Sequence, residues 1–334
     1  MGIPIAINGF GRIGKCILMQ LLENKQFNVV AINATNINIS EIEDYLRYDS
    51  NHRVNIPEVT IIGDNVFTIR HHNIHLLNDR KPENLKWRDY GCKYVIDATG
   101  AFLTEEKCKL HDVDRVIITA PAKDNMPTFI YGVNMDIYNG ENIVSASSCT
   151  TNCLAPCLKL LESNYTIEDV SFTTIHAATA SQYTVDVTKK SSRTNRSILN
   201  NIIPHTTGAT SSVTKVLPEL TGKIYGTSLR VPVSNCSLVD VNIRTTNEIN
   251  LNDVVDLFKS SSYNNVVTGI TDKKVVSSDF MTTTTPCILD KTASIEMGKH
   301  NIKLMLWYDN EWAYSTQILR LIENMEKHTS ISNL

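Results

Sequence analysis

Six residues near the N-terminus, Gly9-Phe-Gly-Arg-Ile-Gly14, separate a short apolar segment from a segment with helical periodicity. The apolar segment, Ile3–Asn8, has the composition of a buried strand, and Ile13–Asn24 repeats apolar residues at the helical period. Glycines at G-x-G-x-x-G spacing permit a tight turn, the close approach of a pyrophosphate and the packing of helix on strand. In this context the cluster predicts a dinucleotide-binding unit rather than a plain glycine turn.

The first half of the chain continues this alternation of short apolar runs with helical stretches. The clearest strand-like runs after the first are Val29–Asn33, Tyr94–Thr99, Val116–Ala120 and Ile143–Ala146. Such an order is typical of the α/β class, with a Rossmann-type doubly wound parallel sheet.

From about residue 150 the pattern changes to longer β-rich segments, Val170–Ala178, Leu229–Arg244 and Lys303–Trp307, which predict a second, α+β domain. Leu251–Ser260 and Trp312–Lys327 have helical periodicity, and the latter is expected to pack on the first domain. We therefore expect a dinucleotide-binding domain over residues 1–149 with a C-terminal helix over 313–334, and a second domain over 150–312.

Composition excludes several classes of protein. Hydrophobic residues make up 42% and charged residues 20% of the 334, and the net charge is 32 − 35 = −3, so neither nucleic acid nor an acidic membrane is an expected partner. The N-terminal segment lacks a basic region, and no apolar run reaches about eighteen residues, which predicts a cytoplasmic protein without a membrane span. In that compartment the eight cysteines are expected to be reduced thiols.

Cys149 lies in Ser145-Ala-Ser-Ser-Cys-Thr-Thr-Asn-Cys-Leu-Ala155, where a strand-like run ends and a helix is predicted to begin. Thr150, Thr151 and Asn152 are good capping residues, so the first free backbone N–H groups are expected to face the sulfur. The positive end of a helix lowers a cysteine pKa from roughly 8.5, most of all beside a histidine. His176 is the candidate partner, and the pair predicts a thiolate nucleophile.

Two other readings of these cysteines are weaker. A buried structural cysteine is the default for any single residue, but hydroxyl and amide side chains surround position 149. Cys149, Cys153 and Cys157 share a helical face, which cannot enclose a tetrahedral ion, and the chain has no C-x-x-C pair. We therefore expect no metal, with Cys153 and Cys157 in the core.

The chain resembles the phosphorylating glyceraldehyde-3-phosphate dehydrogenases nearly from end to end. The matching motifs are Ile7–Gly14, Tyr48–Ser50, Ala98–Gly100, Ala120–Pro121, Ser147–Pro156, His176–Gln182, Asn201–Pro204, Thr207–Gly208, Leu229–Pro232, Ser277–Phe280 and Trp307–Trp312. The resemblance implies oxidation of glyceraldehyde 3-phosphate, with inorganic phosphate, to 1,3-bisphosphoglycerate in glycolysis or gluconeogenesis. It also implies a homotetramer in which the loop around residues 183–200 reaches a neighbour's cofactor.

The resemblance also assigns roles to single residues. Cys149 and His176 correspond to the nucleophile and base, Ser148, Thr150, Thr207 and Gly208 to the inorganic phosphate site, and Thr179 and Arg230 to contacts with the substrate phosphate. The residues that correspond to cofactor contacts are Gly9, Gly11, Arg12, Ile13, Gly14, Ala34, Arg80, Thr119 and Asn310.

The chain departs from the family pattern at several positions. An acidic residue is expected about twenty positions after the glycines to hold the ribose 2′-hydroxyl, but Ala34 stands there. Val187-Thr188 replaces a proline-containing pair in the crossing loop, so NAD, NADP or both are expected as cofactor. Ser211 stands in place of a usual lysine, His205 in place of a small residue, and Ala313 in place of a glycine.

Two alternatives stay open at this level. The related erythrose-4-phosphate dehydrogenase shares the thiol, the histidine and the fold, although Thr207-Gly-Ala209 speaks for a phosphate acceptor. A paralogue without catalysis, serving as a binding module, is the other alternative, and the presence of both Cys149 and His176 speaks against it.

Overall fold

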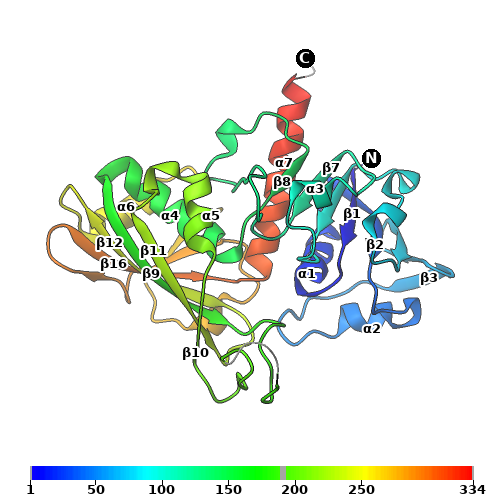
Figure 1. Ribbon diagram of the computed structural model, residues 1–334, viewed down its shortest axis with the longest axis horizontal. Helices are drawn as coiled ribbons and strands as arrows, with labels where there is room; N and C mark the ends of the chain where they lie inside the picture. The colour runs from blue at the N-terminus through cyan, green and yellow to red at the C-terminus, as the bar shows by residue number, and fades with distance from the viewer. Residues whose placement is uncertain (1, 189–192, 333–334) are drawn as a thin grey trace. The chain divides into compact units, whose positions relative to one another are not determined.

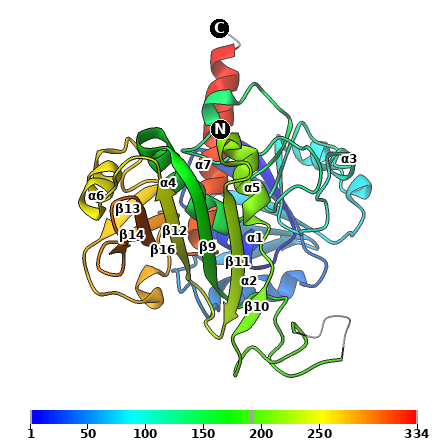
Figure 2. The ribbon, with the colours of Figure 1, turned by 60° about the vertical axis from the view of Figure 1, so that its left-hand side comes forward.

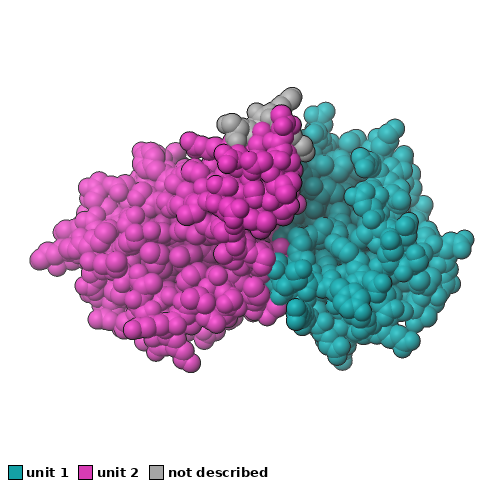
Figure 3. All heavy atoms as spheres, turned by 90° about the horizontal axis from the view of Figure 1, so that it is seen from below, with its two compact units in different colours: residues 1–129, 136–147, 318–334 teal, residues 130–135, 148–317 magenta. Residues whose placement is uncertain are grey.

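The computed structural model describes residues 2–188 and 193–332. It divides into two compact units, coloured separately in Figure 3. Unit 1 comprises residues 1–129, 136–147 and 318–334, and unit 2 comprises residues 130–135 and 148–317. No helix within the described ranges is long and apolar enough to cross a membrane.

Unit 1 is built on an eight-stranded sheet of order β3-β4-β5-β2-β1-β6-β7-β8 (Figure 1). The strands from β5 to β8 along this order are parallel, and β3 and β4 pair antiparallel at one edge. The bounds are β1 Ile3–Asn8, β2 Phe27–Asn33, β3 Val59–Gly63, β4 Val66–Ile69, β5 His72–Leu77, β6 Tyr94–Asp97, β7 Arg115–Ile118 and β8 Ile143–Ser145.

Strand β1 lies between β2 and β6. From β1 the chain first adds strands on the β2 side of the sheet and then crosses to add strands on the β6 side. In a doubly wound sheet this switch point opens a crevice at the carboxyl ends of the strands, where dinucleotides bind. Asn8, Asn33 and Asp97 end these three strands. The helices of this unit are α1 Arg12–Leu21, α2 Ile42–Arg47 and α3 Glu105–Cys108, and α7 Trp312–Ser332 contributes its part from residue 318 onward.

Unit 2 contains a second eight-stranded sheet, of order β10-β11-β9-β12-β16-β14-β13, with β15 paired to β16. Its strands are β9 Ile167–Ala177, β10 Ile203–His205, β11 Ile224–Val231, β12 Ser237–Thr245, β13 Thr268–Thr271, β14 Cys287–Asp290, β15 Ile295–Glu296 and β16 Asn301–Tyr308. Helices α4 Cys149–Tyr165, α5 Ala209–Val216 and α6 Leu251–Ser260 pack on it around one apolar core (Figure 2).

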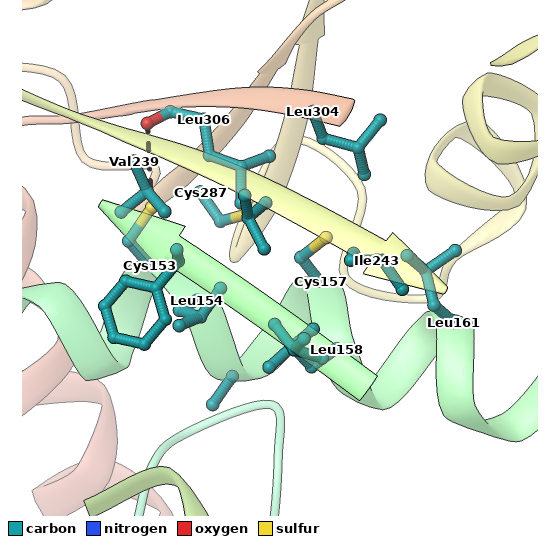
Figure 4. Packing of buried hydrophobic residues seen from close by; sticks show 14 of the residues in the cluster. Cys153, Leu154, Cys157, Leu158, Leu161, Val239, Ile243, Cys287, Leu304 and Leu306 are labelled. Atoms are coloured by element: carbon teal, nitrogen blue, oxygen red, sulfur yellow. Dashed lines mark hydrogen bonds between the residues drawn. The ribbon is translucent and has the colours of Figure 1, made fainter. Parts of the chain in front are cut away.

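Cys153 and Cys157 belong to that core, as the sequence predicts. Both are fully buried, and Figure 4 shows their sulfur atoms beside Cys287, between α4 and the strands. Burial raises the pKa of each thiol, so these cysteines behave as small apolar side chains.

The predicted fold class is confirmed, with differences in detail. Leu229–Arg244 is not one segment, because residues 232–236 separate β11 from β12, where Pro232 lacks an N–H and Cys236 has φ 65°. Strands β3, β4 and β5 lie where the sequence analysis named none. Predicted ends of the other parallel strands differ from the observed ends by up to two residues.

Candidate active site

Cys149 is the first residue of α4, and Ser148 is the residue that caps the helix. The Ser148 hydroxyl accepts a hydrogen bond from the Thr151 N–H at 3.1 Å. The sequence analysis expected the cap among Thr150, Thr151 and Asn152. The cap is instead Ser148, and those three residues lie in the first turn of the helix. The thiol is nevertheless at the helix N-terminus, as expected, and the residue is partly exposed.

His176 comes from β9 and faces the thiol directly. Its Nε2 atom lies 3.4 Å from the Cys149 Sγ atom. Its Nδ1 atom lies 2.8 Å from the Ala177 carbonyl oxygen. A tautomer that donates from Nδ1 to this carbonyl leaves the Nε2 lone pair directed at the thiol, which is the arrangement a general base requires.

Arg230 reaches the same histidine from the neighbouring strand. Strands β11 and β9 are parallel, with Arg230 in register with His176. The Arg230 Nη1 atom donates to the Ala177 carbonyl at 3.1 Å and lies 2.6 Å from His176 Nδ1. Because a guanidinium can only donate, this contact competes with the tautomer that donates from Nδ1, and that tautomer is the one that base catalysis at Nε2 requires. The pair thus has a fixed positive charge beside it.

The pKa of Cys149 differs from the sequence expectation. Burial of the thiol group raises its pKa, although the Arg230 charge and hydrogen bonds from Thr150 act in the opposite direction. Burial also lowers the pKa of His176 to about 4, and the Arg230 charge adds to this effect. Both shifts favour the neutral thiol and the neutral imidazole, whereas the helix terminus and the Arg230 charge favour the thiolate.

Three hydroxyl groups are linked by hydrogen bonds near Cys149 and His176, and no sequence pattern predicts this link. Tyr308 is 1% exposed, and its hydroxyl lies 3.0 Å from Thr150 Oγ1 and 2.9 Å from Thr174 Oγ1. Asn310 is oriented in a similar way, because its Oδ1 accepts from Ser237 Oγ at 2.7 Å. The motif Trp307–Trp312 signalled this region, but no pattern linked Tyr308 to residues more than a hundred positions away.

The remaining predicted residues of unit 2 lie at loop and helix starts. Thr207 and Gly208 precede α5, and the Thr207 hydroxyl accepts from the Ala209 N–H at 3.1 Å. Thr179 is exposed, and its N–H and hydroxyl donate to the Gln182 side chain at 2.9 and 3.0 Å. Ser211, in the place of a usual lysine, donates to the Gly208 carbonyl at 3.0 Å.

Unit 1 has a pocket of about 710 Å³ at the switch point of its sheet. Four of the predicted cofactor residues line it: Gly9, Gly11, Ala34 and Arg80. Arg12, Ile13, Gly14 and Thr119 are not among the lining residues. Arg12 instead pairs with Asp49, with its Nη2 atom 3.0 Å from the carboxylate.

The glycine positions in this unit fit a bound dinucleotide. Gly9 has φ +92°, which other residues rarely adopt, and a Cβ on Gly14 would lie 2.1 Å from the Gly9 carbonyl oxygen. A Cβ on Gly11 would meet nothing within 4 Å, so this glycine faces open space. The three positions match a tight turn, helix-on-strand packing and an open approach for a pyrophosphate.

Comparison with known proteins identifies the relatives of this chain. Residues 3–105 match the family described as glyceraldehyde 3-phosphate dehydrogenase, NAD binding domain, and residues 148–310 match its C-terminal domain. The glyceraldehyde-3-phosphate dehydrogenase of Phytophthora infestans is 41% identical over 331 residues, 97% of this chain and 99% of the relative. That of Shimwellia blattae is 40% identical over 334 residues, and the cytosolic enzyme of Gracilaria gracilis is 38% identical over 335 residues; each alignment covers 98% of this chain and at least 99% of the relative.

Proposed function

The chain belongs to the glyceraldehyde-3-phosphate dehydrogenase family, and we propose that Cys149 and His176 carry its reaction. It is an NAD(P)-dependent oxidoreductase that converts glyceraldehyde 3-phosphate and phosphate to 1,3-bisphosphoglycerate. The observation that supports the residue assignment most directly is the 3.4 Å approach of Cys149 Sγ to His176 Nε2 at the start of α4.

In the first step the thiol attacks the aldehyde carbon. The Cys149 proton passes to His176 Nε2 as the C–S bond forms, because the neutral imidazole is free to accept it. His176 passes this proton to the carbonyl oxygen, which becomes the hydroxyl of a thiohemiacetal. The raised pKa of the thiol favours proton transfer during the attack.

In the second step the thiohemiacetal is oxidised to a thioester on Cys149. Bound NAD(P)⁺ would supply the hydride acceptor. His176 takes the proton of the thiohemiacetal hydroxyl, so that the carbonyl can re-form when hydride is lost. Inorganic phosphate then attacks the thioester carbon, the C–S bond breaks, and the protonated His176 returns its proton to the sulfur.

Helix starts and a half-buried arginine support two anion sites. We assign inorganic phosphate to Ser148, Thr150, Thr207 and Gly208, which stand at the N-termini of α4 and α5. Arg230, with Thr179, is assigned to the phosphate of the substrate. The Thr207 hydroxyl accepts from the Ala209 N–H, so its hydrogen remains available to an anion. The Ser148 hydroxyl accepts from the Thr151 N–H and also lies 2.7 Å from Thr151 Oγ1, so its hydrogen is available to an anion when Thr151 is the donor of that contact.

The two domains have different proposed roles. We assign dinucleotide binding to residues 1–149 with the helix over 313–334, and catalysis to residues 150–312. Asn310, oriented by Ser237, is assigned to the nicotinamide carboxamide. We further propose a cytoplasmic homotetramer. The loop around residues 183–200 is assigned to its interface, and residues 189–192 of that loop lie outside the described residues.

A steady-state assay with two substrates tests the function. We expect turnover of glyceraldehyde 3-phosphate to require phosphate and to saturate with it. Phosphate-independent oxidation of erythrose 4-phosphate at a higher kcat/KM would instead favour the related dehydrogenase. Absence of turnover with both substrates would favour a binding module.

The Thr150 hydroxyl should lower the pKa of the Cys149 thiol, because it hydrogen bonds the sulfur. Thr150→Val removes this donor, so the midpoint of thiol alkylation against pH should move to higher pH. Thr174→Val is the matched control, since Thr174 shares the Tyr308 partner. Equal midpoints in wild type and Thr150→Val would contradict the role of this hydrogen bond.

We also expect the protein to use NADP as well as NAD. Ala34 lines the pocket of unit 1 where NAD-selective relatives carry an aspartate, and an aspartate there would repel a 2′-phosphate. Thr35, beside it in the pocket lining, and Thr188 offer hydroxyl donors. The kcat/KM for NADP should exceed about a hundredth of that for NAD, a gap of roughly 2.7 kcal/mol.

The variant Ala34→Asp tests whether position 34 discriminates between NAD and NADP. It should lower kcat/KM for NADP at least about tenfold while leaving NAD turnover within a few-fold of wild type. Equal losses with both cofactors would show that position 34 does not discriminate between them.

A further inference from the structure

Asp97 ends β6 as a buried carboxylate, 2% exposed, directly behind the pocket of unit 1. It is not a lining residue, but its hydrogen-bond partners are. Its Oδ2 accepts from Asn8 Nδ2 at 2.7 Å. Its Oδ1 accepts from the Thr99 N–H at 3.1 Å and from the Thr99 hydroxyl at 2.7 Å.

The network continues through Asn8 to the next strand and loop. Asn8 Oδ1 accepts from Asn33 Nδ2 at 2.8 Å. The Asn33 side chain then bonds both backbone groups of Asp79, accepting from the N–H at 3.0 Å and donating to the carbonyl at 2.8 Å. Hydrogen bonds thereby connect the ends of β1 and β2 and the loop at Asp79 to the carboxylate at the end of β6. The members of this network that line the pocket are Asn8, Asn33, Asp79 and Thr99.

A second pair of buried side chains orients Asp97 from behind. His111 Nε2 lies 3.4 Å from Asp97 Oδ2, and Trp87 Nε1 donates to His111 Nδ1 at 3.1 Å. Because Nδ1 accepts, Nε2 carries a proton, and it lies near the carboxylate without making a hydrogen bond to it. Burial of a carboxylate costs several kcal/mol unless such partners compensate it, so its presence at this point requires a reason.

We propose that Asp97 is a positioning residue that holds the dinucleotide pocket in its binding shape before the cofactor arrives. The proposal rests on the proposed cofactor function of unit 1. A pocket formed in advance loses less conformational entropy on binding, so cofactor affinity depends on the network while the chemical step at Cys149 does not.

Asp97→Asn tests the proposal with an isosteric change. The amide has one acceptor oxygen, so its NH₂ group must face either the Asn8 amide donor or the Thr99 donors, and at least one bond is lost. We expect Kd and KM for NAD(P) to rise about tenfold or more, with kcat at saturating cofactor changed less than about threefold.

Asp290→Asn is the matched control. Asp290 is also 2% exposed, and its carboxylate accepts from Thr292 and Trp307 in unit 2. This variant should lose thermal stability to a similar degree with cofactor Kd unchanged. Equal Kd values in Asp97→Asn and wild type, or equal increases in both variants, would overturn the proposal.

Amide hydrogen exchange on the wild-type protein gives a second readout that needs no variant. The Thr99 and Asp79 N–H groups donate to side chains of the network, so both should be protected without cofactor. Exchange at the rate of an unstructured peptide until NAD(P) is added would refute formation of the pocket in advance. A wild-type protein that binds no NAD(P) would instead refute the cofactor site itself.

Discussion

Replacement of Cys149 by serine should abolish dehydrogenase activity, with a loss of roughly six orders of magnitude in kcat, as for other enzymes that lose their nucleophile. A serine hydroxyl is scarcely ionised even with His176 beside it, and the thioester cannot form. Thermal stability and NAD(P) affinity should stay close to wild type, because the substitution changes one atom in a partly buried residue at the edge of the core. Steady-state rates and cofactor titration measure these effects.

Cys153→Ser is the matched control for this result. Cys153 lies one turn further along α4, fully buried, so the substitution places a hydroxyl in the core and should lower the melting temperature. Its activity should remain within about tenfold of wild type below that temperature. Activity retained in Cys149→Ser but lost in Cys153→Ser would reassign the nucleophile.

His176→Asn should slow hydride transfer by roughly two to four orders of magnitude, the usual contribution of a positioned acid–base group. The variant removes the Nε2 acceptor that lies 3.4 Å from the thiol. Pre-steady-state formation of reduced cofactor measures this step directly. A rate within tenfold of wild type would mean that another group accepts the proton.

The pH dependence of the wild-type enzyme provides a further check on His176. A base acts only when unprotonated, and burial lowers the pKa of His176 to about 4, so it stays active as the pH falls through 6 and is lost near 4. The acid limb of the hydride-transfer rate should therefore lie near pH 4 and disappear in His176→Asn. An acid limb near 6.5 would contradict the burial effect.

The sequence predicts the parts of this fold that follow strong local patterns. Strand β1, the glycine turn and α1 combine an apolar run, fixed glycine spacing and helical periodicity, and helix α6 has the predicted bounds. Strand β3 escapes prediction because it is mostly exposed at the sheet edge. Strand β4 alternates half-buried and buried residues, but it has only four residues, too few for a clear pattern.

The chemistry of the site is less accessible from the sequence. Motifs and the family resemblance identify Cys149 and His176, but the direction of their pKa shifts depends on how deeply each group is buried and on the Arg230 charge. No sequence pattern predicts a role for Asp97, because a polar residue at the end of a strand is common. Its role appears only when Asn8, 89 positions away along the chain, joins Thr99 and His111 around it.

A single-turnover experiment tests the central claim, that a thioester on Cys149 links oxidation to phosphate transfer. Enzyme mixed with NAD(P)⁺ and glyceraldehyde 3-phosphate, without phosphate, should form about one reduced cofactor per Cys149 and then nearly stop. Addition of phosphate should start steady turnover, and mass spectrometry should find the acyl group on Cys149 before that addition. Continued turnover at the same rate without phosphate, or an acyl group on another residue, would contradict the account.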